Sequence, residues 1–288
     1  MLTSLVLPQI FHLASISTKH MKSKTYIILA FSLGLMACEE INPDLKTTDT
    51  PVIEAFIFPG QDSISISVKK MISYMASDQD TVQQPITDCQ VQLIYHANSI
   101  ILSHDDDNPG TYFTSIENIQ LSPGDTLAFS GTYMNISFSA ETLIPSPPPD
   151  LSISKDKLYY DVSDPRSMMQ AENIILNWSN PELDFYYVFV ENLEEDPEPI
   201  NEMMAEAPKI SFAFPSQSDQ FQISMRNIRY FGEHRVIVFH VNPEFADLFD
   251  NTELTSNAIT EPPGNIENAM GIFTALNADT VYFSVTGI

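Results

Sequence analysis

Short segments in which apolar and polar residues alternate recur through most of the chain and constrain its fold more than any other feature. Residues 63–68 alternate strictly, which places Ile64, Ile66 and Val68 on one face of an extended strand. Turn-forming pairs such as Pro109-Gly110 separate these segments, and the sustained 3.6-residue periodicity of an amphipathic helix is missing from the sequence. The sequence therefore predicts an all-β protein.

Strand-like segments occur about seven times between residues 52 and 144, as often as an immunoglobulin-like sandwich requires. They cover residues 52–58, 63–68, 90–95, 100–102, 111–113, 127–129 and 136–138. Residues 145–150 then interrupt the pattern with four prolines, which cannot donate backbone hydrogen bonds and favour a stiff extended geometry. We predict an N-terminal β-sandwich over residues 52–144 and a proline-rich linker over residues 145–150.

The second module is predicted to cover residues 151–288. An apolar strand ending at Trp178, a turn at Pro181 and a tyrosine-rich strand at 185–190 resemble the start of a fibronectin type III sandwich. Trp178 is the only tryptophan and is expected to pack between the sheets, although stacking on a sugar is the alternative. Further predicted elements are strands at 221–228, 234–241 and 280–285, and a short helix at 242–249.

The start of the chain has the order of features found in a bacterial lipoprotein leader. Lys22 and Lys24 follow Met21, and an uncharged run from residue 25 to 37 comes next. That run is shorter than the roughly 20 apolar residues that a membrane-spanning helix needs, but it fits the core of a signal peptide. It ends in Leu35, Met36 and Ala37, which resemble a lipobox, directly before Cys38. We predict a signal peptide over residues 1–37, with the true start at Met21 and lipid on Cys38.

Residues 38–51 are predicted to form a flexible tether. Glu39 and Glu40 resemble the export signal that sends lipoproteins to the outer face of the outer membrane, although an ordinary solvated spacer has the same composition. The expected location is the outer membrane, reached through the lipid anchor, with the cell surface preferred and the periplasmic face as the alternative.

Charge excludes one class of partner. The chain has 13 Lys and Arg against 38 Asp and Glu, a formal charge of -25. Such a surface repels phosphate backbones, so nucleic acid is not an expected partner. It also repels anionic headgroups, so stable membrane attachment must come from a covalent anchor or an inserted segment.

Two acidic segments raise the question of metal or glycan chemistry. Asp105, Asp106 and Asp107 offer oxygen ligands suited to calcium, but they lie in a predicted hairpin turn, where aspartate is common without metal. The stretch from residue 191 to 206 has seven carboxylates, from which a glycosidase pair can be imagined, but a solvated acidic loop is the simpler interpretation.

Cys89 is the remaining cysteine and is expected to be a buried, unreactive thiol. The histidines outside the leader lack zinc-binding spacing, and no phosphate loop, dinucleotide fingerprint or nucleophile elbow occurs in the sequence. The sequence therefore predicts no catalytic residue, no metal and no cofactor.

The chain resembles a family of Bacteroidetes outer-membrane lipoproteins, domain of unknown function 4249. The resemblance extends over nearly the whole chain after the leader, and its most specific motif is Asn265, Ile266, Glu267 and Asn268, followed by Gly271. Ala269 stands where the family has glycine. Other matching segments are residues 38–40, the strand after Pro51, residues 108–112, residues 121–127 and the proline linker.

The resemblance implies a partner, because such lipoproteins are often encoded beside TonB-dependent outer-membrane receptors. We therefore expect a non-enzymatic accessory or binding component acting beside a TonB-dependent β-barrel receptor. A structural or adhesive surface module is the alternative. A hydrolase that acts on glycans through the acidic stretch is the third hypothesis.

Overall fold

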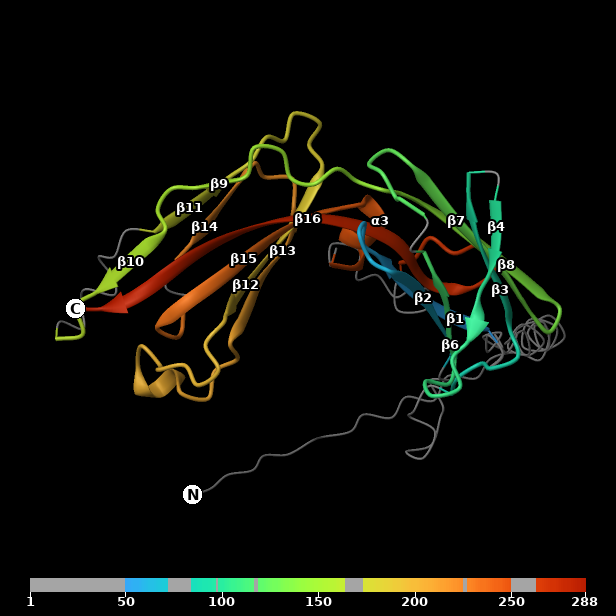
Figure 1. The fold of residues 1–288 in the computed structure, drawn as a ribbon, viewed down its shortest axis with the longest axis horizontal. Helices are drawn as coiled ribbons and strands as arrows, with labels where there is room; N and C mark the ends of the chain where they lie inside the picture. Colours follow the sequence, from blue (N-terminus) through green and yellow to red (C-terminus); the bar gives the residue numbers. More distant parts are fainter. Residues whose placement is uncertain are drawn as a thin grey trace, which may run out of the picture. The chain divides into compact units, whose positions relative to one another are not determined.

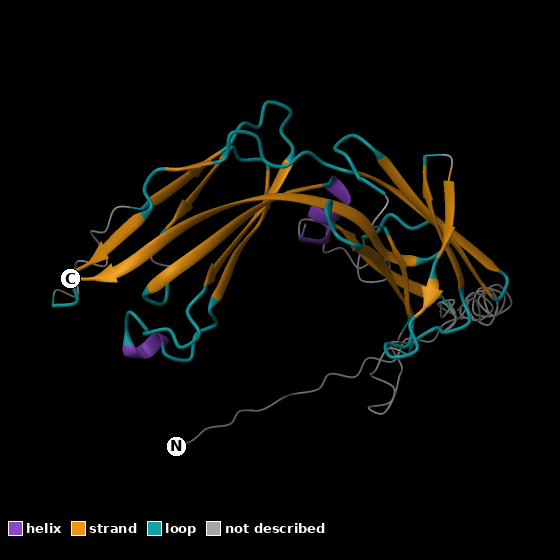
Figure 2. Ribbon diagram, viewed as in Figure 1, coloured by secondary structure: helices purple, strands orange, loops and turns teal. Residues whose placement is uncertain are grey.

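The computed structural model of the chain describes residues 50–71, 84–96, 98–116, 119–163, 173–224, 227–249 and 263–288. Within these ranges strands predominate, and helical turns occur only at η2 (Glu202–Met204), α3 (Pro243–Ala246) and η3 (Asp247–Phe249) (Figure 2). The predicted all-β fold is confirmed. The predicted signal peptide, lipobox, Cys38, Glu39 and Glu40 lie outside the described residues.

Two sheets enclose the first core. One has the strand order β4-β3-β7-β8, and the other contains β5, β6, β2, β1 and the start of β16. All seven strands expected in this part are present, and the short β5 is additional. Their bounds are β1 (Pro51–Ile57), β2 (Ser63–Lys70), β3 (Gln90–Tyr95), β4 (Asn98–Ile101), β5 (Ser103–His104), β6 (Thr111–Ser115), β7 (Thr126–Tyr133) and β8 (Ile136–Leu143).

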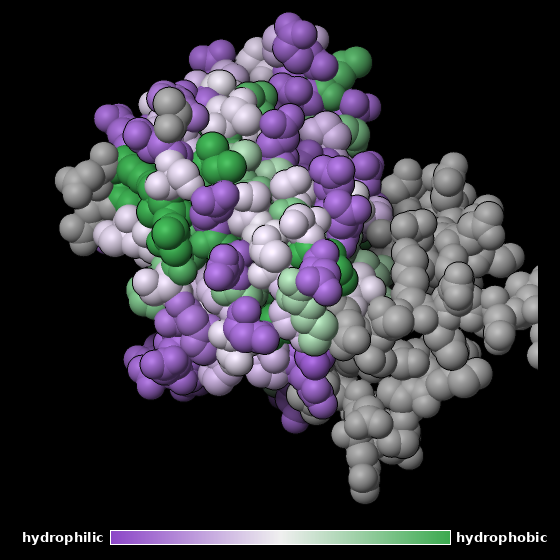
Figure 3. All heavy atoms as spheres, turned by 90° about the vertical axis from the view of Figure 1, so that its right-hand side faces the viewer, coloured by the Kyte–Doolittle hydropathy of each residue, from purple (hydrophilic) through white to green (hydrophobic). Residues whose placement is uncertain are grey.

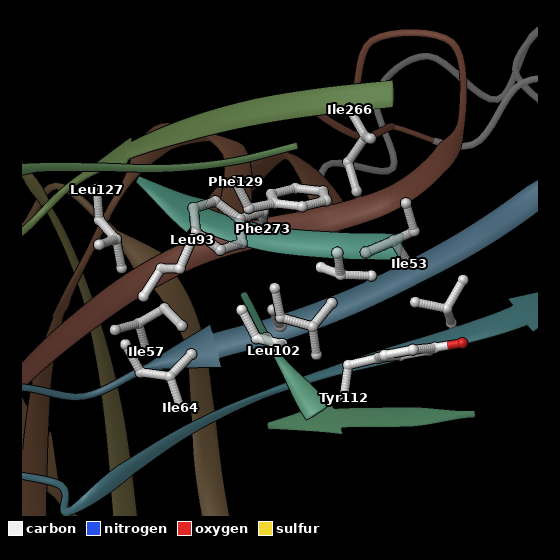
Figure 4. Packing of buried hydrophobic residues seen from close by; sticks show 14 of the residues in the cluster. Ile53, Ile57, Ile64, Leu93, Leu102, Tyr112, Leu127, Phe129, Ile266 and Phe273 are labelled. Carbon is white, nitrogen blue, oxygen red and sulfur yellow. The ribbon is translucent and has the colours of Figure 1, made fainter. Parts of the chain in front are cut away.

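Alternation along the strands builds this core. Ile64, Ile66 and Val68 of β2 are buried, as predicted, and the intervening Ser63 and Ser65 are exposed. Figure 4 shows side chains from β1, β3 and β7 meeting Phe273 of β16 in the same cluster. The ring of Phe129 lies 4.7 Å from that of Phe273. Apolar area removed from water in this way is the main stabilising contribution to such a core.

The second core lies between two further layers. One contains β13, β12, β15, the second half of β16 and β10, and the other is the sheet β14-β11-β9. Trp178 is buried here with its ring 5.3 Å from Tyr186, so the core position predicted for it is confirmed. The strand bounds are β9 (Ser152–Ile153), β10 (Lys157–Tyr160), β11 (Ile174–Asn177), β12 (Phe185–Asn192), β13 (Ile210–Ser216), β14 (Gln220–Ile223), β15 (Gly232–Val241) and β16 (Met270–Gly287).

The sequence prediction differs from this module in two respects. Strands β9, β10 and β13 were not predicted. The strand expected over residues 221–228 ends at Ile223, because the Asn227 side chain accepts a hydrogen bond of 3.0 Å from the Ser224 N–H and turns the backbone. The helix expected over residues 242–249 is present as α3 followed by η3.

Strand β16 belongs to both cores (Figure 1). Its first part pairs in parallel with β1, from Met270 to Ala275, and its later part pairs antiparallel with β15. Ile266, Phe273 and Ala275 therefore pack in the first core. The predicted division differs, since it placed all of residues 151–288 in the C-terminal module. The sequence could not indicate this, because one continuous strand shared by two sheets has no turn or proline to mark where one module ends.

The proline-rich linker is held by hydrogen bonds from the second half of the chain. The Asn277 amide donates to the Pro145 carbonyl at 2.9 Å, and His240 Nδ1 donates to the Ser146 carbonyl at 2.8 Å. The Ser179 N–H donates to the Pro149 carbonyl at 2.9 Å. These contacts and β16 connect the two cores, and residues 46–288 form one compact unit.

Candidate functional site

Eight aromatic side chains form a connected cluster on the outer side of the sheet that contains β1, β12, β13 and β15. We call this cluster the aromatic face. Each ring lies within 5.3 to 6.2 Å of at least one other, measured between centroids. The members are Phe56, Phe58, Tyr187, Phe212, Phe214, Phe239, Phe245 and Phe249.

The alternation of three neighbouring strands produces this face. Tyr186 of β12 and Val238 of β15 point into the second core, so Tyr187 and Phe239 point outward. Tyr187 contacts four rings of the cluster, including Phe245 of α3. Burial raises the pKa of its hydroxyl, which therefore remains protonated.

Several members of the aromatic face are open to solvent. Phe56 is 42% exposed, Phe212 54% and Phe214 63%. Ile210 and Leu248 at the border are 40% and 39% exposed. Soluble proteins rarely expose contiguous large apolar side chains unless the patch binds something. The aromatic face is therefore the strongest candidate binding surface in the described part of the chain.

Two ion pairs lie on the strands near this face. Glu191 of β12 accepts a hydrogen bond from Arg235 of β15, and Glu54 of β1 lies 3.5 Å from the Lys69 ammonium. Paired charges lower the cost of removing the surrounding surface from water. An apolar partner can therefore approach without leaving these charges unpaired.

The family motif has a structural role in this chain. Asn265 Oδ1 accepts a hydrogen bond from the Phe273 N–H at 3.0 Å, and its Nδ2 donates to the Phe273 carbonyl at 2.8 Å. Ile266 is buried in the first core, as Figure 4 shows. The Glu267 N–H donates to the Ser139 carbonyl at 2.8 Å, which joins the loop to β8.

Two residues of this loop have a positive φ. Asn268 has φ +59° and donates a hydrogen bond of 3.1 Å to the Ser137 carbonyl. Gly271 has φ +106°, and an added Cβ would lie 1.9 Å from the Ile53 carbonyl oxygen, so a side chain is excluded there. Ala269 is not among the described residues with positive φ, so alanine fits this position without backbone strain.

A hollow of about 810 Å³ lies between this loop and the outer side of β3, β7 and β8. Polar side chains of its lining bond to one another, as Gln92 does to Ser130 at 2.8 Å and Ser139 to Glu267 at 3.3 Å. Figure 3, seen from this side, shows mainly hydrophilic and intermediate residues with a hydrophobic patch at one edge. This arrangement is typical of a solvated sheet face.

The predicted calcium ligands form a turn. Asp105 accepts hydrogen bonds from the N–H groups of Asp107 and Asn108 at 3.0 and 3.3 Å, and the Asn108 amide that donates to it lowers its pKa. Asp106 lies 3.2 Å from His104 Nδ1. Among the described residues no group of three or more His, Cys, Asp or Glu side chains could hold a metal ion. The described geometry favours the turn interpretation.

The acidic stretch is a surface segment with local structural roles. Its exposed carboxylates are those of Glu194, Glu195, Asp196, Glu198, Glu202 and Glu206. Glu194 Oε1 accepts a hydrogen bond of 3.0 Å from the Glu233 N–H, and Lys209 donates to the carbonyls of Glu194 and Glu195. The segment leads directly into β13.

Cys89 is 8% exposed, and burial raises the pKa of its thiol to about 12. Its backbone N–H donates to the Tyr112 hydroxyl at 2.9 Å, which in turn donates to the Ile86 carbonyl at 3.0 Å. The expectation of a buried, unreactive cysteine agrees with this environment.

Sequence reasoning missed the aromatic face. Ile210, Phe212 and Phe214 do alternate with smaller residues, which is a strand signal, but Pro215 and the acidic stretch on either side obscured it. Phe56 and Phe58 were predicted in a strand, with no indication that Phe56 would lie near Phe245 and Phe58 near Phe239. Within the described ranges, no helix is long and apolar enough to cross a membrane.

The chain is similar to two solved multidomain structures. The crystal structure of the chicken CNTN1 FN1–FN3 domains matches at 9% identity and a TM-score of 0.27, with 67% of this chain and 61% of that chain covered. Domains A168–A170 from titin match at 11% identity and a TM-score of 0.20, with the same coverage. The chain thus spans about three fifths of the length of each. No curated protein matches it.

A family match covers most of the chain, from Cys38 through the first core and into β16. It includes the loop built by Asn265, Glu267 and Asn268 and nearly all strands of both cores. Residues 38–281 match the domain of unknown function DUF4249, and the chain belongs to this family, as its resemblance predicted.

Proposed function

We propose that the chain is a non-enzymatic cell-envelope lipoprotein, anchored to the outer membrane through Cys38, that docks a TonB-dependent transporter through the aromatic face. The exposure of Phe56, Phe212 and Phe214 on one sheet is the observation that carries this proposal. Aromatic side chains are enriched in the centres of protein interfaces, because they bury a large area with few rotatable bonds.

The tether is compatible with such docking. Residues 38–51 can extend to about 45 Å at roughly 3.3 Å per residue, which lets the body reach a neighbouring membrane protein. The lipid restricts diffusion to the membrane, which raises the effective concentration of the two partners. A modest interface is then sufficient for stable association.

Affinity purification tests the proposal. The lipidated full chain is purified from its own membranes in mild detergent, and the yield of a co-purifying β-barrel transporter is measured. The double variant Phe212→Ser with Phe214→Ser is expected to reduce that yield at least about tenfold, since contact residues in the centre of an interface carry most of its binding energy.

Phe113→Ser provides the matched control. Phe113 of β6 is 41% exposed, but Ser63 and Ser65 of β2 separate it from the aromatic face. The control should retain the transporter. Equal yields from the control and the double variant, or consistent absence of a β-barrel, would contradict the proposal.

The same exposed face also favours a second function, an adhesive or structural envelope module. In that case the Phe212→Ser, Phe214→Ser variant would weaken cell attachment or envelope integrity and leave nutrient uptake unchanged. The docking function predicts the reverse, with uptake reduced and attachment retained.

A further inference from the structure

Strand β13 stands at one end of the nine-stranded sheet. Its inner edge pairs with β12, and no strand in the described ranges pairs with its outer edge. An edge strand of this kind presents a row of N–H and C=O groups that a further strand can use. The edge runs directly along the aromatic face, since Phe212 and Phe214 belong to β13.

The ladder shows which backbone groups point outward. The Asn192 N–H donates to the Lys209 carbonyl at 2.9 Å, so this pair is hydrogen-bonded across the two strands. Hydrogen-bonded pairs alternate along an antiparallel ladder, which makes Ser211 and Ala213 the next residues directed at β12. The backbone groups of Ile210 and Phe212 are therefore directed away from the sheet.

Pro215 limits the length of this edge. It lacks an N–H, and the register of β12 against β13 shifts opposite it, between Tyr186 and Val188. Proline is tolerated at such a position because the register shift leaves one extra residue of β13 outside the regular pairing with β12. A strand added to β13 can pair only over residues 210–214.

Charge distinguishes the two ends of the edge. The acidic stretch that ends beside Ile210 exposes Glu194, Glu195, Glu202 and Glu206. The cations there, Lys209 and Arg229, donate to backbone carbonyls of the same region. An incoming segment with basic residues at the Ile210 end would therefore be electrostatically favoured.

We propose that β13 accepts an extended segment of the partner protein as an added strand, with alternate apolar side chains against Phe212 and basic residues beside the acidic stretch. This inference rests on the proposed docking function and specifies its mode. Main-chain hydrogen bonds would supply affinity, and the aromatic face and carboxylates would supply selectivity.

Fluorescently labelled peptides test the added strand on the full chain in detergent. Each has six alternating threonine and valine residues and three lysines, placed at the C-terminus in one peptide and at the N-terminus in the other. The first fits antiparallel addition and the second parallel addition. One of them is expected to bind, and a version with three glutamates in place of lysine is expected to bind at least about tenfold more weakly.

Paired variants isolate the backbone contribution. Phe212→Ala removes the ring and keeps the N–H, whereas Phe212→Pro removes both and leaves the β12 ladder intact. Binding to F212P should be about fivefold weaker than to F212A, which corresponds to one main-chain hydrogen bond. The Ile210→Ala and Ile210→Pro pair should show the same difference. Trp178 fluorescence confirms that each variant folds.

Three results would overturn strand addition: neither lysine peptide binds, F212P binds as tightly as F212A, or the chain forms a dimer that F212P abolishes. A dimer that F212P abolishes would mean that a second copy of the chain, and not a partner protein, pairs with the open edge of β13. Transporter capture that needs Phe212 and Phe214 while F212P equals F212A would refute strand addition alone. Peptide binding without any captured transporter would refute only the proposed partner.

Discussion

The side-chain amide of Asn242 donates a hydrogen bond of 2.9 Å to the hydroxyl of Thr142, 100 residues earlier in the chain. The same hydroxyl accepts from the Ala275 N–H at 3.0 Å and donates to Glu244 at 3.0 Å. Asn242 and Thr142 are both buried. This network lies where the chain passes between the two cores, so we expect it to couple their unfolding.

Asn242→Ala tests that coupling. The variant removes the side-chain donor to the Leu143 and Ala275 carbonyls and one of the two donors to the Thr142 hydroxyl, so the free energy of unfolding should fall by about 2–3 kcal/mol. In the unaltered chain, urea unfolding followed by Trp178 fluorescence and by far-UV circular dichroism should give one shared midpoint. Gln92→Ala, which removes two exposed side-chain hydrogen bonds, should change stability by less than about 0.5 kcal/mol. Separate midpoints in the unaltered chain would refute the coupling.

Gly271→Ala should be strongly destabilising, by about 3–5 kcal/mol, because the new Cβ collides with the Ile53 carbonyl where β16 pairs with β1. Gly60→Ala is the matched control. Gly60 also has a positive φ, +86°, but nothing lies within 4 Å of its added Cβ, so only the backbone cost of about 1–2 kcal/mol is expected. Equal losses in urea denaturation would mean that the collision with Ile53 relaxes freely.

Local patterns predicted much of this fold. Strict alternation identified β2, and Pro109-Gly110 and Pro123-Gly124 marked turns in which each glycine has a positive φ. These features depend on neighbouring residues, which a single sequence displays. Strand β16 could not be predicted in full, because residues 272–276 are buried on successive positions between two cores and then give way to alternation.

The candidate site depends on tertiary structure to a greater degree. The rings of Phe56 and Phe245 lie 6.2 Å apart although 189 positions separate the two residues in sequence. Each of these aromatic residues is typical of a β-strand. Whether its side chain is exposed depends on which face of the sheet is covered by another layer of the fold. The sequence singled out residues 265–268 as a motif, and their contacts with Ser139 and Phe273 give them a structural role that the sequence alone did not specify.

His234 should make stability depend on pH. Burial lowers the pKa of its imidazole below the ordinary 6.5, and Nδ1 donates to the Gly232 carbonyl at 3.0 Å. Below pH 6.5 the imidazole is protonated in the unfolded chain but stays neutral in the folded chain. The free energy of unfolding therefore falls from pH 6.5 down to the folded pKa and then levels off. His234→Gln should have a shallower slope of unfolding free energy between pH 7 and 5. Both proteins contain the same carboxylates, so subtracting one slope from the other cancels their contribution. Identical slopes would contradict the assignment to His234.

Cys89 should be chemically silent in the folded chain. The thiolate is the reactive form, and a pKa of about 12 leaves on the order of one thiol in 10,000 ionised at pH 8. In a Cys38→Ser background Cys89 is the only thiol, so dithiobis(nitrobenzoate) should release no colour from the native protein and one equivalent in urea. Adding Ser63→Cys, on the exposed side of β2, should give one equivalent without urea. Prompt labelling of Cys89 under native conditions would mean that the Tyr112–Ile86 segment opens often enough to admit the reagent, and that the first core is less well closed at this edge than its hydrogen bonds indicate.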